Sequence, residues 1–414
     1  MNKQVLRHDS ICRICGSDKI QTVLKLKDTP LEDQFVTKEQ LEIDQPVYPL
    51  ELAICQNCGY LHLPHIVNPE VSYADYVYVS GVTVGLRNHY DEYAESIKND
   101  FQIKENSLVV DLGSNDGSML ASFKKIGMKI QGVEPAAGIA KQANEAGLNT
   151  IHGFFTDATV GAITEKHGQA DVVTANYMYA NIDNVIEFTK NVTSLLSPDG
   201  IFVVQTGYHP EQFKIKMFDY IYHEHFSYFS VSVLQHLFDV CGLELIHVKK
   251  MLPKGGSIRV VAQLKGKKRI IDPNVKEILL EEEKLGIEKT ETFKKLGNDL
   301  DDLKKALITN LKKLKSEGKK IIGFGASHST TTLLYHFELF EFLEYLVDDN
   351  VLKQNKFSPG YHIPVYSTDK LYTDKPEYVV VLAWQHRESI LKKHNKFIEQ
   401  GGHWILPLPE LVIK

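Results

Sequence analysis

The 414-residue chain lacks several features that mark membrane, secreted and nucleic-acid-binding proteins. Its most apolar run, residues 378–384, is far too short to span a bilayer, and charged residues interrupt any signal-peptide core near the start. Positive charge is not in excess, because the sequence has 47 Lys and Arg residues and 53 Asp and Glu residues. Nucleic-acid binding usually needs a basic face. We therefore expect a soluble, cytoplasmic protein with no membrane or nucleic-acid partner.

Cysteine is also scarce, with five residues in all. Four of them form two Cys-x-x-Cys pairs, each followed by glycine: Cys12, Cys15, Cys55 and Cys58. Four thiolates close a tetrahedral zinc site with no open position, so the pairs predict a structural zinc module. A redox role is the alternative, but redox motifs rarely occur as two matched pairs. The fifth cysteine, Cys241, is expected to be a buried core thiol.

The rest of the sequence has no repeat or low-complexity segment, and its length exceeds one hydrophobic core. Short apolar runs alternate with amphipathic helical patterns, such as those at 119–126 and 185–196. This alternation indicates α/β domains with mostly parallel, doubly wound sheets. The predicted strands cover 107–110, 129–133, 171–175 and 200–205 in the middle of the chain, and 320–324, 343–347 and 378–383 near its end.

A charged segment, residues 275–315, has apolar residues at helical spacing. It predicts amphipathic helices packed on the domains, and a helix that binds a partner is the alternative. Gly286 and Gly297 are expected to interrupt the helical pattern.

A glycine-containing loop follows the first predicted strand of the middle region. Asp111 ends that strand, and Gly113, Asn115 and Gly117 follow before a helix. Glycine lets the backbone approach a ligand closely. The spacing is not Gly-x-Gly-x-x-Gly, so a dinucleotide is disfavoured, and Asp111 suits a ligand with an ammonium group.

Further polar groups end the neighbouring strands. Glu134 lies 21 residues after Gly113, where a carboxylate can accept both hydroxyls of a ribose. Phe155 is placed to flank an adenine, and Asn176 ends the fourth strand. An amino acid joined to an adenosine fits this set, and we therefore predict S-adenosylmethionine as the cofactor. The alternative is a doubly wound domain without a ligand.

The chain resembles the sugar C-methyltransferases that act on nucleotide-linked 4-keto-deoxysugars. The resemblance covers nearly the whole sequence and rests on the order of its motifs. These are the cysteine pairs and the segments 113–117, 132–135, 222–230, 255–259, 323–327 and 347–350. It implies an N-terminal zinc module (1–70), a Rossmann-like methyltransferase domain with a parallel-rich sheet (71–265), and a Rossmann-like C-terminal domain with linker helices (266–414).

The resemblance also implies an activity, namely methyl transfer to C3 of the sugar in deoxysugar biosynthesis. The family's catalytic residues match Tyr76, Tyr222, Glu224 and His225. Two positions depart from the family pattern, because Asn181 and Lys254 stand where histidine is usual. The carrier is expected to be thymidine diphosphate rather than guanosine diphosphate, and a monomer is expected.

The residues suggest roles in that reaction. Carbon methylation next to a ketone needs an enolate, and a neutral histidine is a suitable base near pH 7. We assign the base to His225 and the hydrogen bonds to the enolate oxygen to Tyr222 and Tyr76. Glu224 would fix a histidine tautomer or bind a sugar hydroxyl. A second metal on His223 and His225 is the alternative, although no third ligand is evident.

The C-terminal region carries a second loop between a strand and a helix. Gly323, Gly325 and Ser327 resemble a pyrophosphate turn that lacks its third glycine, and Asp348 ends the next strand. In the family this domain helps to hold the nucleotide of the substrate, so these four residues are candidate substrate ligands. Other hypotheses are O- or N-methylation of a related sugar, an NAD-dependent oxidoreductase, and a zinc-ribbon nucleic-acid binder, which the acidic net charge disfavours.

Overall fold

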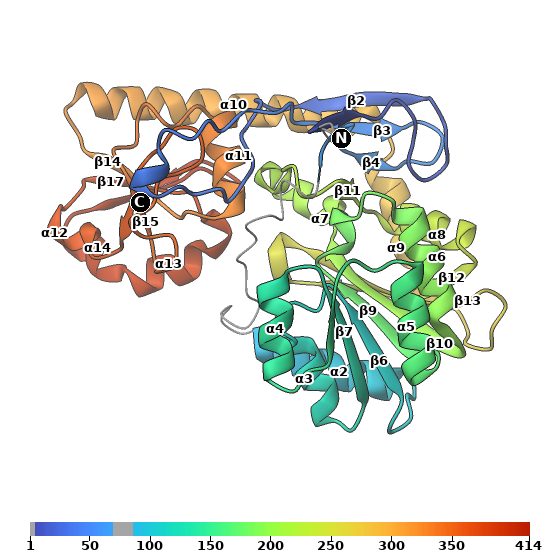
Figure 1. Cartoon of the computed structure of the whole chain (residues 1–414). Coiled ribbons are helices and arrows are strands. Elements are labelled where there is room, and N and C mark those ends of the chain that lie inside the picture. Colours follow the sequence, from blue (N-terminus) through green and yellow to red (C-terminus); the bar gives the residue numbers. More distant parts are fainter. Residues whose placement is uncertain (1–4, 69–85) are drawn as a thin grey trace.

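The computed structural model describes residues 5–68 and 86–414, which form three sheets of more than two strands (Figure 1). The N-terminal sheet is antiparallel, with strand order β11-β4-β3-β2. Its strands are β2 (Ile20–Lys25), β3 (Glu51–Cys55), β4 (Leu61–His62) and β11 (Ser227–Tyr228). β11 comes from far along the chain, so the N-terminal module shares its sheet with the middle region. A separate pair joins β1 (Leu6–His8) to β5 (His65–Val67).

The middle region is built on a seven-stranded sheet of order β12-β13-β10-β9-β6-β7-β8. The parallel strands are β6 (Leu108–Leu112), β7 (Lys129–Glu134), β8 (Thr150–His152), β9 (Ala170–Asn176) and β10 (Leu196–Gly207). The antiparallel edge consists of β12 (Leu243–Met251) and β13 (Ser257–Leu264). The four strands predicted here from the sequence are confirmed, with ends that differ by a few residues.

Helices cover both faces of this sheet. They are α2 (Leu86–Asp100), α3 (Ser118–Lys125), α4 (Ala137–Glu145), α5 (Asp157–His167), α6 (Val185–Leu195) and α8 (Val231–Val240). Successive side chains of a strand point to opposite faces, and so Val110 packs in the core of α6 and α8 whereas Val109 packs in the core of α2 and α3. Burial on both faces explains why the central strands are continuous apolar runs.

The C-terminal sheet has the order β16-β15-β14-β17-β18-β19 and is parallel except for β19. Its strands are β14 (Ile321–Phe324), β15 (Leu346–Asp348), β16 (Val365–Ser367), β17 (Tyr378–Val381), β18 (His403–Leu406) and β19 (Val412–Ile413). Its helices are α11 (His328–His336), α12 (Lys370–Thr373), α13 (Arg387–Lys393) and α14 (Asn395–Glu399). The three predicted strands are present, although β15 begins three residues later than expected.

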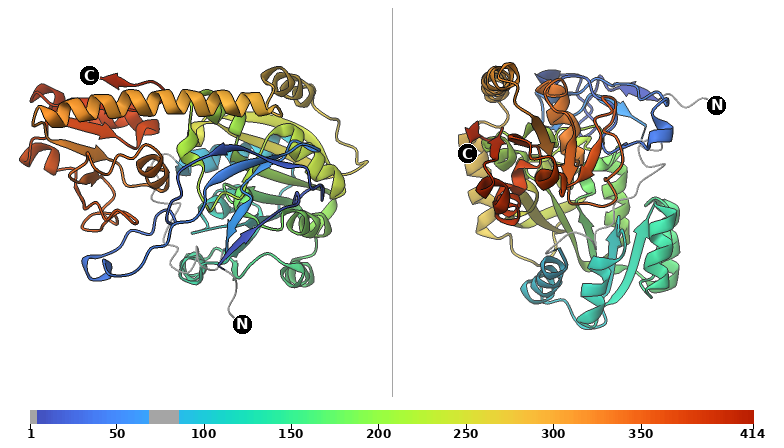
Figure 2. Two further views of the ribbon diagram at one scale, coloured as in Figure 1. Left: turned by 90° about the horizontal axis from the view of Figure 1, so that it is seen from above. Right: turned by 90° about the vertical axis from the view of Figure 1, so that its left-hand side faces the viewer.

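The charged segment forms two helices, α9 (Pro273–Leu285) and α10 (Thr290–Ser316). Gly286 ends α9 with a left-handed φ of 62°, as expected. The expected break at Gly297 is wrong, because this residue lies inside α10, where an added Cβ would stand 3.5 Å from Leu24. α10 runs from the N-terminal sheet to the C-terminal sheet and buries one apolar face against both (Figures 1 and 2). The prediction that these helices pack on the domains is confirmed.

Residues 215–228 lie where the three parts meet. Phe218 and Phe226 belong to one apolar cluster with Leu52 of the N-terminal sheet and Leu333 of α11. Short helices flank this junction or other loops: α7 (His209–Lys214), η1 (Lys38–Gln40), η3 (Tyr179–Asn181), η4 (Phe218–Tyr220), η5 (Pro253–Gly255) and η6 (Trp384–His386). Within the described ranges, no helix combines the length and apolar character that a membrane crossing would need.

Candidate active site and zinc centre

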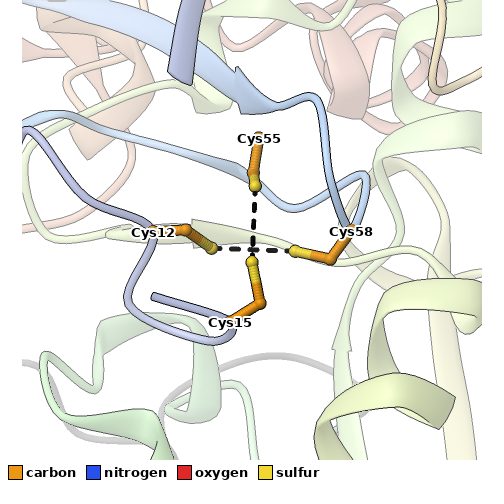
Figure 3. A group of neighbouring side chains, drawn as sticks. All are labelled: Cys12, Cys15, Cys55 and Cys58. Carbon is orange, nitrogen blue, oxygen red and sulfur yellow. Dashed lines mark hydrogen bonds between the residues drawn. The ribbon is translucent and has the colours of Figure 1, made fainter. Parts of the chain in front are cut away.

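The two cysteine pairs converge on one point beside the N-terminal sheet (Figure 3). Each pair forms the same turn, in which the glycine after the second cysteine donates its N–H to the carbonyl of the first over 2.9 Å. These glycines, Gly16 and Gly59, have φ values of 71° and 73°, a conformation that other residues rarely adopt. The two turns therefore present their sulfurs symmetrically.

The spacing of the four sulfurs fits one zinc ion. Cys12 and Cys58 are 3.6 Å apart, Cys15 and Cys55 are 3.6 Å apart, and all four sulfurs lie within 4.8 Å of one another. A tetrahedron with Zn–S bonds of about 2.3 Å has sulfur separations of about 3.8 Å. Zinc held by four thiolates has no open position, so it stabilises the fold and takes no substrate. Cys241 is buried as predicted, and burial raises the pKa of its thiol to about 11.

The predicted cofactor loop connects β6 to α3. Gly113 and Gly117 have φ values of 67° and 78°, and a Cβ at either would come within 2.8 Å of Met178 or 2.6 Å of Leu148, respectively. Both positions thus require glycine, because the backbone is left-handed there and no room is left for a Cβ. Asn115 lies between them, also with positive φ. The loop turns tightly at the carboxyl end of β6, which is where a doubly wound sheet binds ligands.

Glu134 ends β7 beside this loop. Its carboxylate accepts N–H bonds from Asn115 over 2.9 Å and from Ala136 over 2.8 Å. Burial raises the pKa of Glu134, although these two bonds partly offset that effect. Each oxygen of the carboxylate keeps a further lone pair, so the oriented group suits a ribose diol.

Asp111 and Asn176 complete the carboxyl edge of the sheet. The Thr174 hydroxyl donates to Asp111 over 2.5 Å, and burial raises the pKa of Asp111 to about 7. The side-chain oxygen and nitrogen of Asn176 are buried, and hydrogen bonding by this side chain partly offsets the rise in the pKa of Asp111 and of Tyr93. Asn176 thus lies beside Asp111 at the carboxyl end of β9, and its contact with the cofactor stays a prediction. These residues fit the amino-acid end of S-adenosylmethionine.

The aromatic residue predicted to flank adenine is less accessible than its neighbour. Phe155 packs edge to face on Phe188 at 5.2 Å between centroids and is half-buried. Phe154 is 55% exposed. Sequence pattern alone did not reveal which of the two consecutive rings packs on the core.

The side chains of His223 and His225 point in different directions. His223 points into the protein, where its Nδ1 lies 2.9 Å from Glu32 and both side chains are fully buried. His225 instead faces Tyr220 and Tyr222. The two histidines therefore share no ligand position, and the cysteine cluster is the sole metal-type group of three or more ligands found in the described ranges. The alternative of a second metal site on these histidines finds no support in this geometry.

His225 is held in one tautomer. Its Nδ1 lies 3.1 Å from the carbonyl oxygen of Tyr220, and because a carbonyl only accepts, Nδ1 carries the proton. Nε2 then has a free lone pair in the neutral ring. The imidazole stacks on Tyr222, with 4.1 Å between centroids and 30° between planes. The pKa of His225 is lowered to about 3, mainly by burial and also by the charges of Lys254 and His328, against the opposing effect of the bond to the Tyr220 carbonyl.

Glu224 lies at the contact between modules. Its carboxylate is 3.8 Å from Nε2 of His328 in α11, and Nδ1 of His328 is 3.6 Å from Asp33 of the N-terminal module. Lys353 pairs with the same Asp33. The pKa of Glu224 is raised to about 8, mainly by burial and also by the carboxylates of Glu32 and Asp33. Sequence reasoning missed Asp33, His328 and Lys353, because no local pattern connects three such distant segments.

The C-terminal loop is organised like the cofactor loop. Asp348, at the end of β15, accepts N–H bonds from Ala326 over 2.6 Å and Asn350 over 2.7 Å. Gly325 has a φ of 114°, and a Cβ there would lie 2.7 Å from Ala383. Gly323 is inside β14, where a Cβ would lie 2.6 Å from Leu346. Of the candidate ligands, Ser327 and Asp348 thus border one turn, whereas Gly323 serves packing.

Two further positions singled out from the sequence stay untested. Tyr76 lies outside the described residues, as do Tyr73 and Tyr78. Asn181, which departs from the family pattern, ends η3 and is half-buried. The roles assigned to individual residues of the candidate site, and the domain limits at 70 and 265, stay predictions.

Comparisons with known proteins agree with this arrangement. A family model described as a C-methyltransferase C-terminal domain matches residues 253–409, a zinc binding domain model matches 12–73, and a methyltransferase domain model matches 86–248. The C-methyltransferase NovU of Streptomyces niveus is 32% identical over 409 residues, which cover 99% of this chain and 97% of NovU.

Solved structures resemble part of the chain only. The PH0226 protein from Pyrococcus horikoshii OT3 is 15% identical, with a TM-score of 0.36, and the match covers 47% of this chain and 98% of that one. The CcbJ methyltransferase from Streptomyces caelestis is 15% identical, with a TM-score of 0.35, and the match covers 46% of this chain and 94% of that one. Identity with NovU along nearly the whole length carries the assignment: the chain belongs to the family of S-adenosylmethionine-dependent C-methyltransferases with an N-terminal zinc-binding domain.

Proposed function

We propose that the protein methylates C3 of a nucleotide-linked 4-keto-deoxysugar. The observation that carries this proposal is the tautomer of His225. Because Nδ1 donates to the Tyr220 carbonyl, the unprotonated Nε2 is available to accept a proton from a carbon acid. Methylation of an oxygen or nitrogen does not require an enolate and therefore does not need such a base.

The environment of His225 keeps the imidazole ready as a base. Its lowered pKa means that the ring is neutral at pH 7, so the lone pair on Nε2 is present in nearly every molecule. The same low pKa makes the ring a weak base in water. Proton transfer from carbon therefore requires that the enolate is stabilised as it forms.

Tyr222 is placed to supply part of that stabilisation. Burial raises the pKa of its phenol well above the usual value, so the hydroxyl keeps its proton and can donate a hydrogen bond. As Nε2 of His225 takes the proton from C3, the electron pair of the C–H bond moves into the C3–C4 bond. The ketone π electrons then move onto the oxygen at C4, where a donor is needed. Tyr76 is a second candidate donor.

S-adenosylmethionine, when bound, supplies an electrophilic methyl group whose bond to sulfur breaks with its electron pair going to sulfur. Asp111, Glu134 and Asn176 orient the cofactor at the carboxyl edge of the sheet. Gly113 and Gly117 let the backbone approach it. Holding two reactants in line converts the encounter into a unimolecular step, which is worth several orders of magnitude in rate.

The nucleotide of the substrate is assigned to the C-terminal loop. Asp348 orders the turn that contains Gly325 and Ser327, and this turn leads into the N-terminus of α11, a position that favours a phosphate group. Thymidine diphosphate is the carrier to test first, and guanosine diphosphate the second.

Deuterium exchange tests the proposal. The protein is incubated in heavy water with a thymidine-diphosphate-linked 4-keto-6-deoxy sugar, with and without S-adenosylmethionine. We expect one deuterium without the methyl donor and one methyl group with it, both detected by mass spectrometry. Exchange by His225→Gln should be slower by about 100-fold or more, with S-adenosylmethionine still bound. No exchange with either nucleotide carrier, or methylation of a sugar oxygen or nitrogen, would overturn the proposal.

A further inference from the structure

Lys254 occupies an unusual backbone position between β12 and β13. Its φ of 56° and ψ of 42° are left-handed, which costs a residue other than glycine about 1 kcal/mol or more. The neighbouring glycines fix the loop, because a Cβ at Gly255 would collide with the sulfur of Met217 and one at Gly256 would lie 2.7 Å from Glu211. The Lys254 carbonyl also accepts a bond from Gln212 over 3.2 Å. The loop is therefore held in place, and the side chain of Lys254 starts from a defined point.

The ammonium of Lys254 faces the carboxyl edge of the methyltransferase sheet. Its Nζ lies 4.5 Å from the centroid of the Tyr177 ring, which is within the range of a cation–π contact. Tyr177 directly follows Asn176 of the cofactor edge, and its hydroxyl accepts a bond from Gln205 over 2.7 Å. Lys254 thus lies next to the end of the sheet where the methyl donor is expected.

The same ammonium acts on the proposed base. Its charge lowers the pKa of both Glu224 and His225, so Lys254 lies within electrostatic reach of both residues. Solvent reaches Lys254, yet the surrounding protein desolvates its ammonium and lowers its pKa to about 8, against the opposing attraction of Glu224. Lys254 is therefore mostly cationic at pH 7.

We propose that Lys254 is a catalytic residue whose ammonium faces the ketone oxygen at C4 of the sugar and stabilises the enolate formed by His225. This inference rests on the proposed function. It follows from two observations: Lys254 contacts Tyr177 at the cofactor edge, and its charge acts on His225. The carbon that loses its proton to His225 must also meet the methyl group, so the reacting part of the sugar is expected near both. The enolate oxygen is the negative charge that appears during that step, and a cation beside it lowers the barrier.

Three variants test the role of Lys254. Lys254→Met removes the charge at similar length, Lys254→Arg keeps the charge, and Lys254→Asn removes it with a residue that tolerates the left-handed backbone. The matched control is Lys249→Met, which changes an exposed lysine of the same hairpin. Deuterium exchange is measured without the methyl donor, over a range of concentrations of the thymidine-diphosphate-linked 4-keto sugar. Binding of S-adenosylmethionine is measured by calorimetry.

We expect Lys254→Met and Lys254→Asn to lower the saturated exchange rate about 100-fold, with KM and cofactor affinity changed less than about threefold. Lys254→Arg should keep a tenth or more of the rate, and Lys249→Met should match the wild type. If KM rises while the saturated rate stays unchanged, Lys254 binds the diphosphate instead and the inference is wrong. Unchanged exchange in all variants would also contradict it. Absence of exchange by the wild type would overturn the proposed function itself, so the two failures are distinct.

Discussion

The imidazole of His225 and the phenol ring of Tyr222 stack with 4.1 Å between their centroids and 30° between their planes. The stack covers one face of the imidazole, and the Tyr220 carbonyl fixes Nδ1. The ring can therefore act only through Nε2. The surrounding protein desolvates both rings. This desolvation keeps the imidazole of His225 unprotonated and the phenol of Tyr222 protonated at neutral pH.

This burial predicts the pH profile of deuterium exchange. An imidazole with the ordinary pKa of about 6.5 would be about 90% protonated at pH 5.5, and exchange would fall about tenfold from its value at high pH. The pKa of His225 is lowered to about 3, so its neutral form persists as the pH falls. Glu224 and Lys254, with pKa values near 8, stay protonated below pH 7. We expect the saturated exchange rate to change less than about twofold between pH 5.5 and 7.

An acid limb with an apparent pKa near 6.5 would contradict this picture. Circular dichroism at each pH serves as the control, because it separates loss of fold from loss of base.

Removal of the negative charge of Glu134 should weaken the binding of S-adenosylmethionine. Glu134→Gln loses the anionic acceptor that orders Asn115 and Ala136 and that faces the expected ribose. A hydrogen bond to a charged group contributes about 1.5–3 kcal/mol, so the Kd for S-adenosylmethionine should rise at least about tenfold in calorimetry. Glu145→Gln, at the exposed end of α4, is the matched control and should bind as the wild type does. Equal affinity in both variants would exclude Glu134 from the cofactor site.

Loss of one zinc ligand should destabilise the fold without altering the chemistry directly. Cys58→Ser should lower the zinc content, measured by inductively coupled plasma emission spectroscopy. It should also lower the Tm by about 5 °C or more, because the free energy of metal binding contributes to folding. Cys241→Ala changes a buried thiol outside the cluster, and its zinc content should equal that of the wild type. Full zinc occupancy in Cys58→Ser would show that the four-thiolate site is not the metal centre.

The two glycines of the linker helices should respond in opposite directions. Gly297→Ala lies inside α10, where the new methyl group meets Leu24 at 3.5 Å, so the variant should gain about 0.5–1 kcal/mol in stability. Gly286→Ala places a Cβ at a φ of 62°, 3.2 Å from Lys289, and should lose about 1 kcal/mol. Thermal unfolding of both variants under one condition gives the sign. Destabilisation by Gly297→Ala would mean that α10 and β2 pack more tightly than the structure indicates.

The sequence by itself determined the local features of this protein. Cys-x-x-Cys-Gly repeated twice predicts the zinc turns, because two thiolates and a left-handed glycine are contained in five consecutive residues. The alternation of apolar runs and amphipathic segments predicts the sheets, because both faces of the central strands are buried. The acidic strand ends at Asp111 and Glu134 follow from the same periodicity, since parallel strands bring their carboxyl ends to one edge.

Only the tertiary structure decided which residue of the polar segment 222–225 can act as a base. His223 and His225 are two residues apart, yet one is buried against Glu32 of the N-terminal module and the other keeps a free Nε2. The partners that make this distinction, Glu32 and Tyr220, come from different elements. Charge and burial depend on what surrounds a side chain in space, and contacts between segments about 190 residues apart leave no local pattern to read.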